Sequence, residues 1–164
     1  MKYIAYSLML VSFLMLGSCK KCKKKDCQND ASCSLLNNEA VCSCKDFYEG
    51  DVCDIETRSK YVGVYTGKVT YTFSGITLPT NTLNFSVESV GSTASKFKFS
   101  ATDGSSTTTF NCKLTSETSF VLESVTGSSG AWEGSGTIST GNLSMSGNIT
   151  SGSSKGTYKL SASR

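Results

Sequence analysis

The stretch YVGVYTGKVTYTF, residues 61–73, decides the fold of the larger part of this chain. Its aromatic residues share the odd positions with one valine and two glycines: Tyr61, Gly63, Tyr65, Gly67, Val69, Tyr71 and Phe73. Side chains at alternate positions of a β-strand lie on the same face of a sheet. The stretch therefore predicts a strand with one buried face.

The same alternation continues to the end of the chain. The apolar residues that take part are Leu83, Phe85 and Val87, then Phe97 and Phe99, Phe110, Cys112 and Leu114, Phe120 and Leu122, Trp132 and Ile138, Leu143, Met145 and Ile149, and Tyr158 and Leu160. Between these runs lie segments rich in glycine, asparagine and serine, which are typical of turns: 78–81, 103–105, 127–130, 140–142 and 151–153. We expect about eight antiparallel strands over residues 61–164, because no helical periodicity separates them. An up-and-down β-barrel or meander is the favoured architecture of this mostly β chain, and a β-sandwich is the alternative.

The chain has eight cysteines, and six of them are crowded into a short segment before the strands. They are Cys22, Cys27, Cys33, Cys42, Cys44 and Cys53, with the spacing C-x4-C-x5-C-x8-C-x-C-x8-C. A segment of this size cannot bury enough apolar surface to fold unaided, so we expect disulfides instead of a core, and an oxidising compartment. Zinc binding at Cys42-Ser43-Cys44 is the alternative, but zinc sites prefer C-x2-C pairs. We therefore expect no metal in this segment.

This spacing, together with the segment CSCKDFYEGDVC at residues 42–53, resembles the EGF-like family. The resemblance implies an EGF-like module over residues 22–54 and three bridges: Cys22–Cys33, Cys27–Cys42 and Cys44–Cys53. Tyr48 and Gly50 match an aromatic residue and a glycine of the family's last loop, whereas Phe47 replaces a glycine, so we expect a somewhat different turn. Lysines stand where calcium-binding members have acidic residues, so we predict no calcium site there. Residues 55–60 are polar and are predicted to be a linker.

The N-terminal residues have the pattern of an export signal. Residues 4–16 form an apolar stretch that is long enough for a signal peptide and short for a membrane-spanning helix. Leu16-Gly17-Ser18-Cys19 then resembles the bacterial lipobox, which implies a signal peptide over residues 1–18 and a lipid on Cys19. An ordinary secretory signal with a chance cysteine is the alternative. Several acyl chains, such as palmitate, would anchor the protein stably to a membrane.

The residues after Cys19 bear on the location. Lys20 stands where aspartate is the usual inner-membrane retention signal, so the lipobox resemblance favours the outer membrane, with the facing leaflet left open. Residues 19–21 are predicted to be a lipidated cysteine and the start of a basic tether. The chain has a net charge of +3, but this basic run is short and lacks interleaved aromatic residues. Binding to nucleic acid is therefore not expected.

Enzyme chemistry finds little support in the composition. The chain has no histidine, so it lacks the commonest general base and the commonest metal ligand. The acidic residues are scattered and no catalytic pair stands out. Cys112 lies alone on an inward position, where a buried free cysteine behaving as a small apolar residue is expected. We predict no catalytic residue, no metal and no cofactor.

Residues 61–67 and the segment GSGTISTGNL at residues 134–143 resemble the lipocalin-like β-domains of small bacterial lipoproteins. The resemblance implies a barrel that takes a small apolar ligand inside. The candidate lining residues are Tyr65, Phe85, Phe97, Phe99, Phe110, Trp132 and Tyr158. The alternative, which we favour, is that these side chains fill the core. An apolar cavity above about 300 Å³ would indicate a carrier, and a filled interior would argue against one.

Together these features predict a membrane-anchored lipoprotein of the bacterial envelope or surface. We expect a non-catalytic binding or display module on an EGF-like stalk, held to the membrane by its acyl chains. A carrier of a small apolar ligand is one alternative. A surface adhesin or glycan binder that uses serine- and threonine-rich loops is another, and an envelope or surface protein is a further candidate partner.

Overall fold

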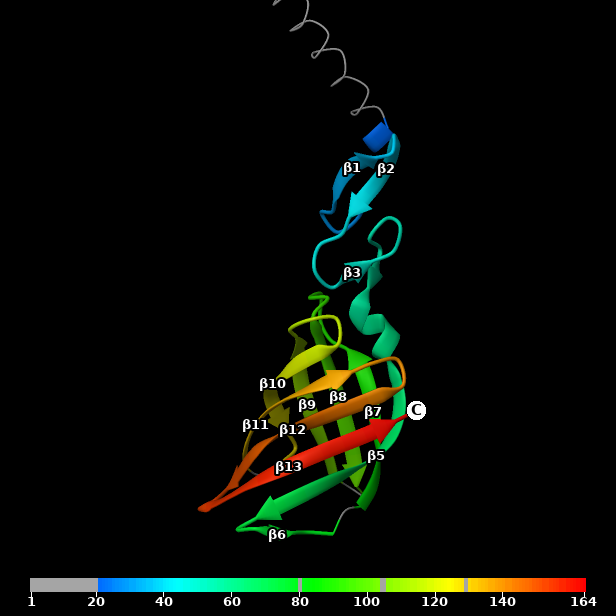
Figure 1. Cartoon of the computed structure of the whole chain (residues 1–164). Coiled ribbons are helices and arrows are strands. Elements are labelled where there is room, and N and C mark those ends of the chain that lie inside the picture. The colour runs from blue at the N-terminus through cyan, green and yellow to red at the C-terminus, as the bar shows by residue number, and fades with distance from the viewer. Residues whose placement is uncertain (1–20, 80, 104–105, 129) are drawn as a thin grey trace, which may run out of the picture. The chain divides into compact units, whose positions relative to one another are not determined.

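The computed structural model describes residues 21–79, 81–103, 106–128 and 130–164 (Figure 1). The predicted signal peptide, Cys19 and Lys20 lie outside the described residues. The chain divides into two compact units, with the boundary between Glu56 and Thr57. Within the described residues, no helix has the length and apolar character needed to cross a membrane.

The second unit is a closed antiparallel β-barrel. Its strands are β5 (Gly63–Phe73), β7 (Asn81–Ser89), β8 (Lys96–Asp103), β9 (Ser106–Leu114), β10 (Ser119–Thr126), β11 (Ala131–Ile138), β12 (Asn142–Ser151) and β13 (Ser154–Ser163). Each strand pairs with the next, and β13 returns to pair with β5, from Gly156 opposite Phe73 to Ser163 opposite Thr66. Figure 1 shows this closure where the red strand β13 lies beside the green strand β5. The predicted up-and-down barrel is confirmed.

The alternation of apolar and polar residues along each strand places one set of side chains inside the barrel, and this set forms the core. Inward positions of every barrel strand contribute buried apolar side chains, among them Tyr65, Val69, Phe85, Phe99, Phe110, Phe120, Ile138, Met145, Tyr158 and Leu160. Exposed apolar residues such as Val64 take outward positions. Burial of one face of each strand is the main contribution to the stability of this unit.

Two glycines of β11 make room for large rings from other strands. A Cβ atom on Gly134 would lie 2.2 Å from the hydroxyl oxygen of Tyr158, and one on Gly136 would lie 2.6 Å from the Phe120 ring. Both distances are far below van der Waals contact. The absence of side chains at these positions therefore lets Tyr158 and Phe120 lie across the inside of the barrel.

One end of the barrel is closed by η1 (Thr57–Tyr61) and Arg164. The hydroxyl of Tyr65 lies 3.0 Å from the carbonyl oxygen of Tyr61. The guanidinium of Arg164 stands over the Tyr65 ring, 5.5 Å from its centre, and donates to the carbonyl oxygen of Val62 at 2.9 Å. These contacts combine a cation–π interaction with charge-assisted hydrogen bonds and so seal this end.

The segment predicted as a linker, residues 55–60, has regular structure. Its first residues form β4 (Ile55–Glu56) in the first unit, and the rest belong to η1 in the second. Arg58 is buried, and its guanidinium donates to the carbonyl oxygens of Val90, at 2.6 Å, and Gly91, at 2.9 Å. Arg58 therefore holds the connection between β7 and β8, a role that its polar surroundings in the sequence did not indicate.

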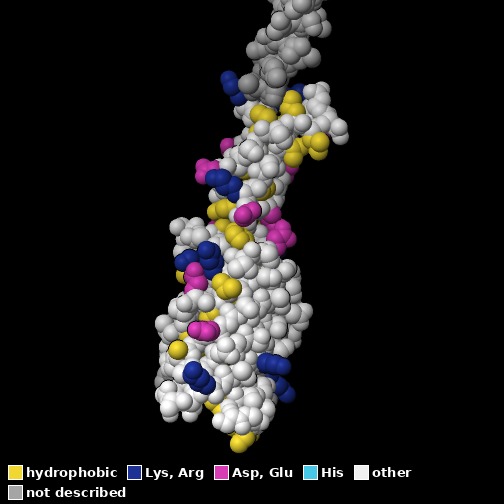
Figure 2. Space-filling model, turned by 60° about the vertical axis from the view of Figure 1, so that its left-hand side comes forward, with side chains coloured by type: hydrophobic (Ala, Val, Ile, Leu, Met, Phe, Trp, Pro, Cys, Tyr) yellow, Lys and Arg dark blue, Asp and Glu magenta, His cyan; other side chains and the backbone are white. Residues whose placement is uncertain are grey.

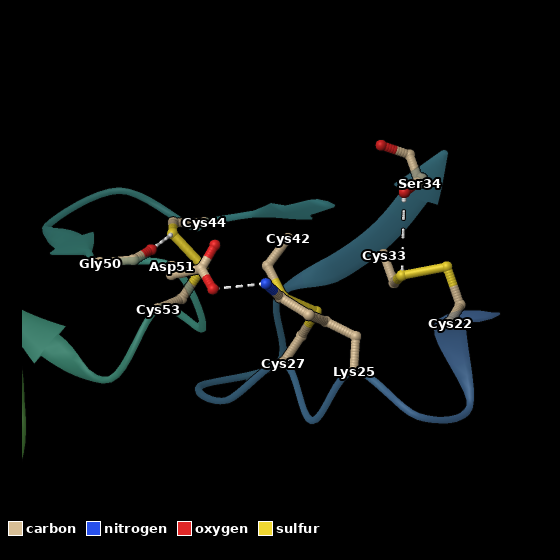
Figure 3. Close-up of a disulfide and its surroundings, with 10 residues drawn as sticks. All are labelled: Cys22, Lys25, Cys27, Cys33, Ser34, Cys42, Cys44, Gly50, Asp51 and Cys53. Atoms are coloured by element: carbon tan, nitrogen blue, oxygen red, sulfur yellow. Dashed lines mark hydrogen bonds and ion pairs between the residues drawn. A yellow bond between two sulfur atoms is a disulfide. The ribbon is translucent and has the colours of Figure 1, made fainter. Parts of the chain in front are cut away.

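The first unit is built from two small hairpins and three disulfides. β1 (Ser32–Leu36) pairs with β2 (Glu39–Ser43), and β3 (Tyr48–Glu49) pairs with β4. The bridges are Cys22–Cys33, Cys27–Cys42 and Cys44–Cys53, which is the pairing that the EGF-like resemblance implied (Figure 3). The ion pair between Lys25 and Asp51 at 2.5 Å, also visible in Figure 3, contributes little because the Asp51 carboxylate is exposed.

Left-handed backbone conformations mark the turns of this unit. Asn37 and Asn38, with φ of 50° and 65°, form the two-residue loop between β1 and β2, as a type I′ hairpin turn requires. Phe47, where the EGF-like resemblance implied a somewhat different turn, has φ of 69°. It therefore takes a glycine-like conformation itself, at a steric cost that glycine would not have.

A candidate ligand site at the far end of the barrel

A cavity of about 210 Å³ lies inside the barrel at the end remote from η1. Its apolar wall is formed by Val69, Tyr71, Leu83, Ala101, Phe110 and Trp132. These residues share the inward parity of the buried core and occupy the far ends of β5, β7, β8, β9 and β11. The strand pattern thus places them around one space, because the barrel brings these strand ends together.

Aromatic rings form the floor of the cavity. The Trp132 ring lies edge-on to Phe110, at 5.4 Å between ring centres, and to Tyr71, at 6.1 Å, and it also lies 4.9 Å from the Tyr158 ring. Its indole nitrogen Nε1 donates to Ser128 Oγ at 3.2 Å. These contacts hold the indole in one orientation. Trp132 is the chain's single tryptophan, so its fluorescence reports this site alone.

Hydroxyl groups border part of the same cavity. Ser106 and Thr108 of β9 and Ser128 of the β10–β11 connection complete its lining. None of the described residues that line the cavity carries a charged side chain. The cavity therefore combines an apolar, largely aromatic wall with a neutral hydrogen-bonding border.

The predicted lining residues are distributed over a larger region. Tyr65, Phe85, Phe97, Phe99, Phe110 and Tyr158 are all at most 3% exposed. Phe99 stacks on Phe110 at 4.6 Å, and Phe97 meets Phe120 edge-on at 5.2 Å. These rings fill the interior between the closed end and the cavity. Of the predicted set, Phe110 and Trp132 line the cavity itself.

Other lining residues were missed by sequence reasoning. The alternation predicts Val69, Tyr71 and Leu83 as inward strand residues but does not mark them as part of a site, and it does not include Ala101. The available signal was their place at one common end of the alternating runs. That signal becomes informative only when the direction of every strand in the barrel is known.

Burial disfavours the charged forms of the Tyr71 and Tyr158 phenols and of the Cys112 thiol by raising the pKa of each group. Burial raises the pKa of Tyr158 to about 12, with further contributions from Cys112 and Tyr71, and burial also raises the pKa of Tyr71. The free thiol of Cys112 is buried, and burial together with the charge of Glu123 raises its pKa. A thiol in this state is a poor nucleophile. In the described part of the chain, no cluster of three potential metal-ligating side chains is present.

The barrel wall beside the cavity is less tightly paired than the other walls. β10 and β11 are in register only from Ser119 to Val121, and β10 has a bulge between Leu122 and Ser124. Toward the cavity, the Tyr158 hydroxyl donates to the carbonyl oxygen of Glu133 at 3.3 Å, in the part of β11 without register partners on β10. Segments with few backbone hydrogen bonds generally open more easily than fully paired ones.

The outer face of β10, β11 and β12 has a different character. An open groove of about 510 Å³ there is bordered by outward hydroxyl-bearing residues, among them Ser119, Ser135, Thr137, Ser144 and Ser146. The face of the barrel drawn in Figure 2 is largely white, which marks uncharged polar side chains and backbone, with few charged groups. The hydroxyls of this chain therefore lie on strand surfaces as well as in loops.

Comparisons with models of protein families, with curated proteins and with solved structures found no match for this chain. The functional argument therefore depends on the residues and the geometry described above.

Proposed function

We propose that this chain is a lipid-anchored, non-catalytic binding module of the bacterial cell envelope, whose barrel holds a small apolar group beside Trp132. The single observation that carries the proposal is the cavity of about 210 Å³ at one end of the barrel, beyond the described core of buried aromatic side chains. Ligand sites are typically concave and mostly apolar, with a few polar groups that orient the ligand. The cysteine-rich first unit serves in this proposal as an EGF-like spacer.

Binding fits the site better than catalysis does. General acid–base catalysis works best with a group whose pKa lies near the working pH. The phenols of Tyr71 and Tyr158 and the thiol of Cys112 are shifted away from that range, since burial raises the pKa of each. The lining of the cavity offers hydroxyls and rings, which suit orientation and packing of a ligand.

The size of the cavity argues against a carrier that encloses a whole drug-sized molecule. Pockets for such molecules measure about 300 Å³ or more. Here the aromatic core occupies the deeper interior, with Phe85 and Phe99 at 0% exposure. The geometry supports a module that receives one small group, either as a free ligand or as the end of a larger one.

The binding proposal is tested with the protein purified gently from membranes and analysed by native mass spectrometry, together with a panel of probes added to the delipidated protein. The panel contains toluene, hexanol, benzoate and oleate, and Trp132 fluorescence is the readout. We expect at least one probe to bind, and binding to be lost in Ala101→Leu, which fills the cavity. Thr102→Leu, on the outward face of the same strand, is the matched control. If no probe binds and no small molecule co-purifies with the protein, the binding proposal is refuted.

Anchoring is tested separately. We expect Cys19→Ala to move the protein from the membrane fraction to the soluble extract with the barrel still folded, and Cys112→Ala to leave it on membranes. Retention of Cys19→Ala on membranes would refute lipidation at this residue.

A second candidate function is glycan binding on the outer face, which the groove bordered by Ser135 and Ser146 favours. Hydroxyls opposite one another on paired strands, such as Ser135 and Ser146, can each exchange hydrogen bonds with a sugar. Glycan-array binding that is abolished by Ser135→Lys, and kept by Ala101→Leu, would support this function. Array binding insensitive to Ser135→Lys would count against the groove.

A further inference from the structure

The volume of the cavity limits what can enter it. An apolar cavity of about 150 Å³ accommodates one benzene ring. A cavity of about 210 Å³ therefore accommodates one ring with a small substituent, and it is too small for a fused polycyclic molecule or a long folded chain. The Trp132 and Phe110 rings are nearly perpendicular, with 5.4 Å between their centres. Aromatic rings prefer edge-to-face or offset-stacked packing, and these two rings offer a bound ring both an edge and a face.

The chemistry of the lining selects against charge. Taking an ionised group out of water costs several kcal/mol unless a partner of opposite charge receives it. The described lining residues supply no such partner. Thr108 and Ser106 supply hydroxyls on one side, which can exchange hydrogen bonds with a neutral polar substituent.

Residues 76–78, which fold back beside the end of β5, continue the apolar inner surface beyond the cavity. After a two-residue turn, β6 (Ile76–Thr77) folds back along the end of β5, with Ile76 opposite Phe73. The Leu78 amide donates to the Tyr71 carbonyl at 2.9 Å, which places Leu78 opposite Tyr71. Directly opposite residues of an antiparallel pair lie on the same face. Ile76 and Leu78 therefore extend the face that carries Tyr71.

These two rim side chains are unusually exposed for apolar residues. Ile76 is 67% exposed and Leu78 is 42% exposed, although both lie on the face that is buried farther along β5. We call them the lip. A ligand that filled the cavity would still have an apolar surface, the lip, on which a further part of it could lie.

We infer that the site selects an uncharged amphiphile with a single-ring head group, which enters the cavity, and an aliphatic chain, which lies along the lip of Ile76 and Leu78. This inference rests on the proposed function, because it specifies the ligand class of the same cavity. The ring packs against Trp132 and Phe110, a neutral polar substituent meets Thr108, and the chain leaves the barrel over β6.

The test for charge compares benzyl alcohol with benzoate, which have the same ring and nearly the same size. We expect benzoate to bind roughly 100-fold more weakly, from a desolvation penalty of a few kcal/mol at about tenfold per 1.4 kcal/mol. The readouts are Trp132 fluorescence and calorimetry at neutral pH. Equal affinity for the two probes would overturn the charge selection.

The test for the lip uses phenols with a chain of increasing length at the 4-position, from ethyl to hexyl. A fully buried methylene strengthens binding about fourfold, so on a half-exposed lip we expect about twofold per methylene. The double variant Ile76→Ser/Leu78→Ser should abolish this dependence on chain length and leave the affinity for unsubstituted phenol unchanged. Val62→Ser/Val64→Ser, which alters two exposed valines near the closed end, is the matched control and should keep the dependence.

The outcomes separate this inference from the function on which it rests. If no probe binds, the binding function itself fails. If oleate or benzoate binds as well as the neutral single-ring probes, or if chain length has no effect in the unaltered protein, the function stands and the assignment of the ligand class is refuted.

Discussion

Replacement of Phe99 by alanine tests whether the deep interior of the barrel is a packed core or ligand space. Phe99 is 0% exposed, and its ring stacks on Phe110 at 4.6 Å and lies edge-on to Phe85 at 6.2 Å and to Phe120 at 6.4 Å. Phe→Ala substitutions in cores cost about 3–5 kcal/mol. Because three ring partners lose their contacts here, we expect a loss of about 4–5 kcal/mol, which is a large share of the ~5–15 kcal/mol that stabilises a typical domain.

The assay is equilibrium unfolding in urea followed by the fluorescence of Trp132, which reports the barrel alone. Phe99→Leu, which keeps most of the volume, should cost less than about 1.5 kcal/mol. Val64→Ala, at a position 64% exposed, should change the free energy of unfolding by no more than about 0.5 kcal/mol. A loss below about 1 kcal/mol for Phe99→Ala, with weaker binding of the probes, would show that Phe99 faces ligand space and would refute the packed core.

Four further changes test other parts of the structure. Gly134→Ala should lower the free energy of unfolding in urea by about 1–3 kcal/mol, because the new Cβ atom would lie 2.2 Å from the Tyr158 hydroxyl. The loss caused by Gly134→Ala should be smaller in a Tyr158→Phe background, and simple additivity of the two changes would contradict this contact. The free energy of unfolding should fall as the pH rises from about 10 toward 12. The reason is that the pKa of Tyr158 is raised to about 12 in the folded barrel, so the unfolded chain loses this proton first. Unfolding midpoints measured across this range should fall less for Tyr158→Phe than for the unaltered protein. Asn38→Val should destabilise the β1–β2 hairpin by about 1 kcal/mol or more and Asn38→Gly should not, because φ of 65° suits glycine and excludes β-branched residues. Hydrogen exchange of the β1 and β2 amides measures the difference. In the Cys19→Ala protein, Cys112 should be silent toward a thiol reagent until the barrel unfolds, when one thiol should titrate; rapid reaction of the folded protein would contradict its burial.

The strands of the barrel were predictable because each carries its own periodicity. Tyr65 and Val69 on β5, or Phe97 and Phe99 on β8, alternate with polar residues whatever the neighbouring strands are. The bulge in β10 was not predictable in this way. It inserts one residue between Leu122 and Ser124, so the register changes, and Val125 comes to lie opposite Phe110. A shift of parity within one strand is invisible until its partner strand is known.

The cavity and the lip depend still more on the tertiary structure than the strands do. Trp132 and Phe110 were candidates because they are large and inward, but the same is true of Phe85 and Phe99, which lie in the filled core. What distinguishes the two groups is depth along the barrel axis. The lip of Ile76 and Leu78 was likewise hidden, because the short strand β6 shows no alternation of its own.

The sequence by itself determined which residues face inward, where the turns fall, and that the cysteine-rich segment depends on disulfides, because alternation, turn chemistry and cysteine spacing are local properties. The pairing of the cysteines came from a resemblance and agrees with the three bridges of the structure. Only the tertiary structure decided that β13 closes on β5, that Arg164 and η1 seal one end, and that a cavity remains at the other. The physical reason is that closure and cavity volume are set by contacts between residues far apart in the chain, whose side chains fill the interior completely at one depth and incompletely at another.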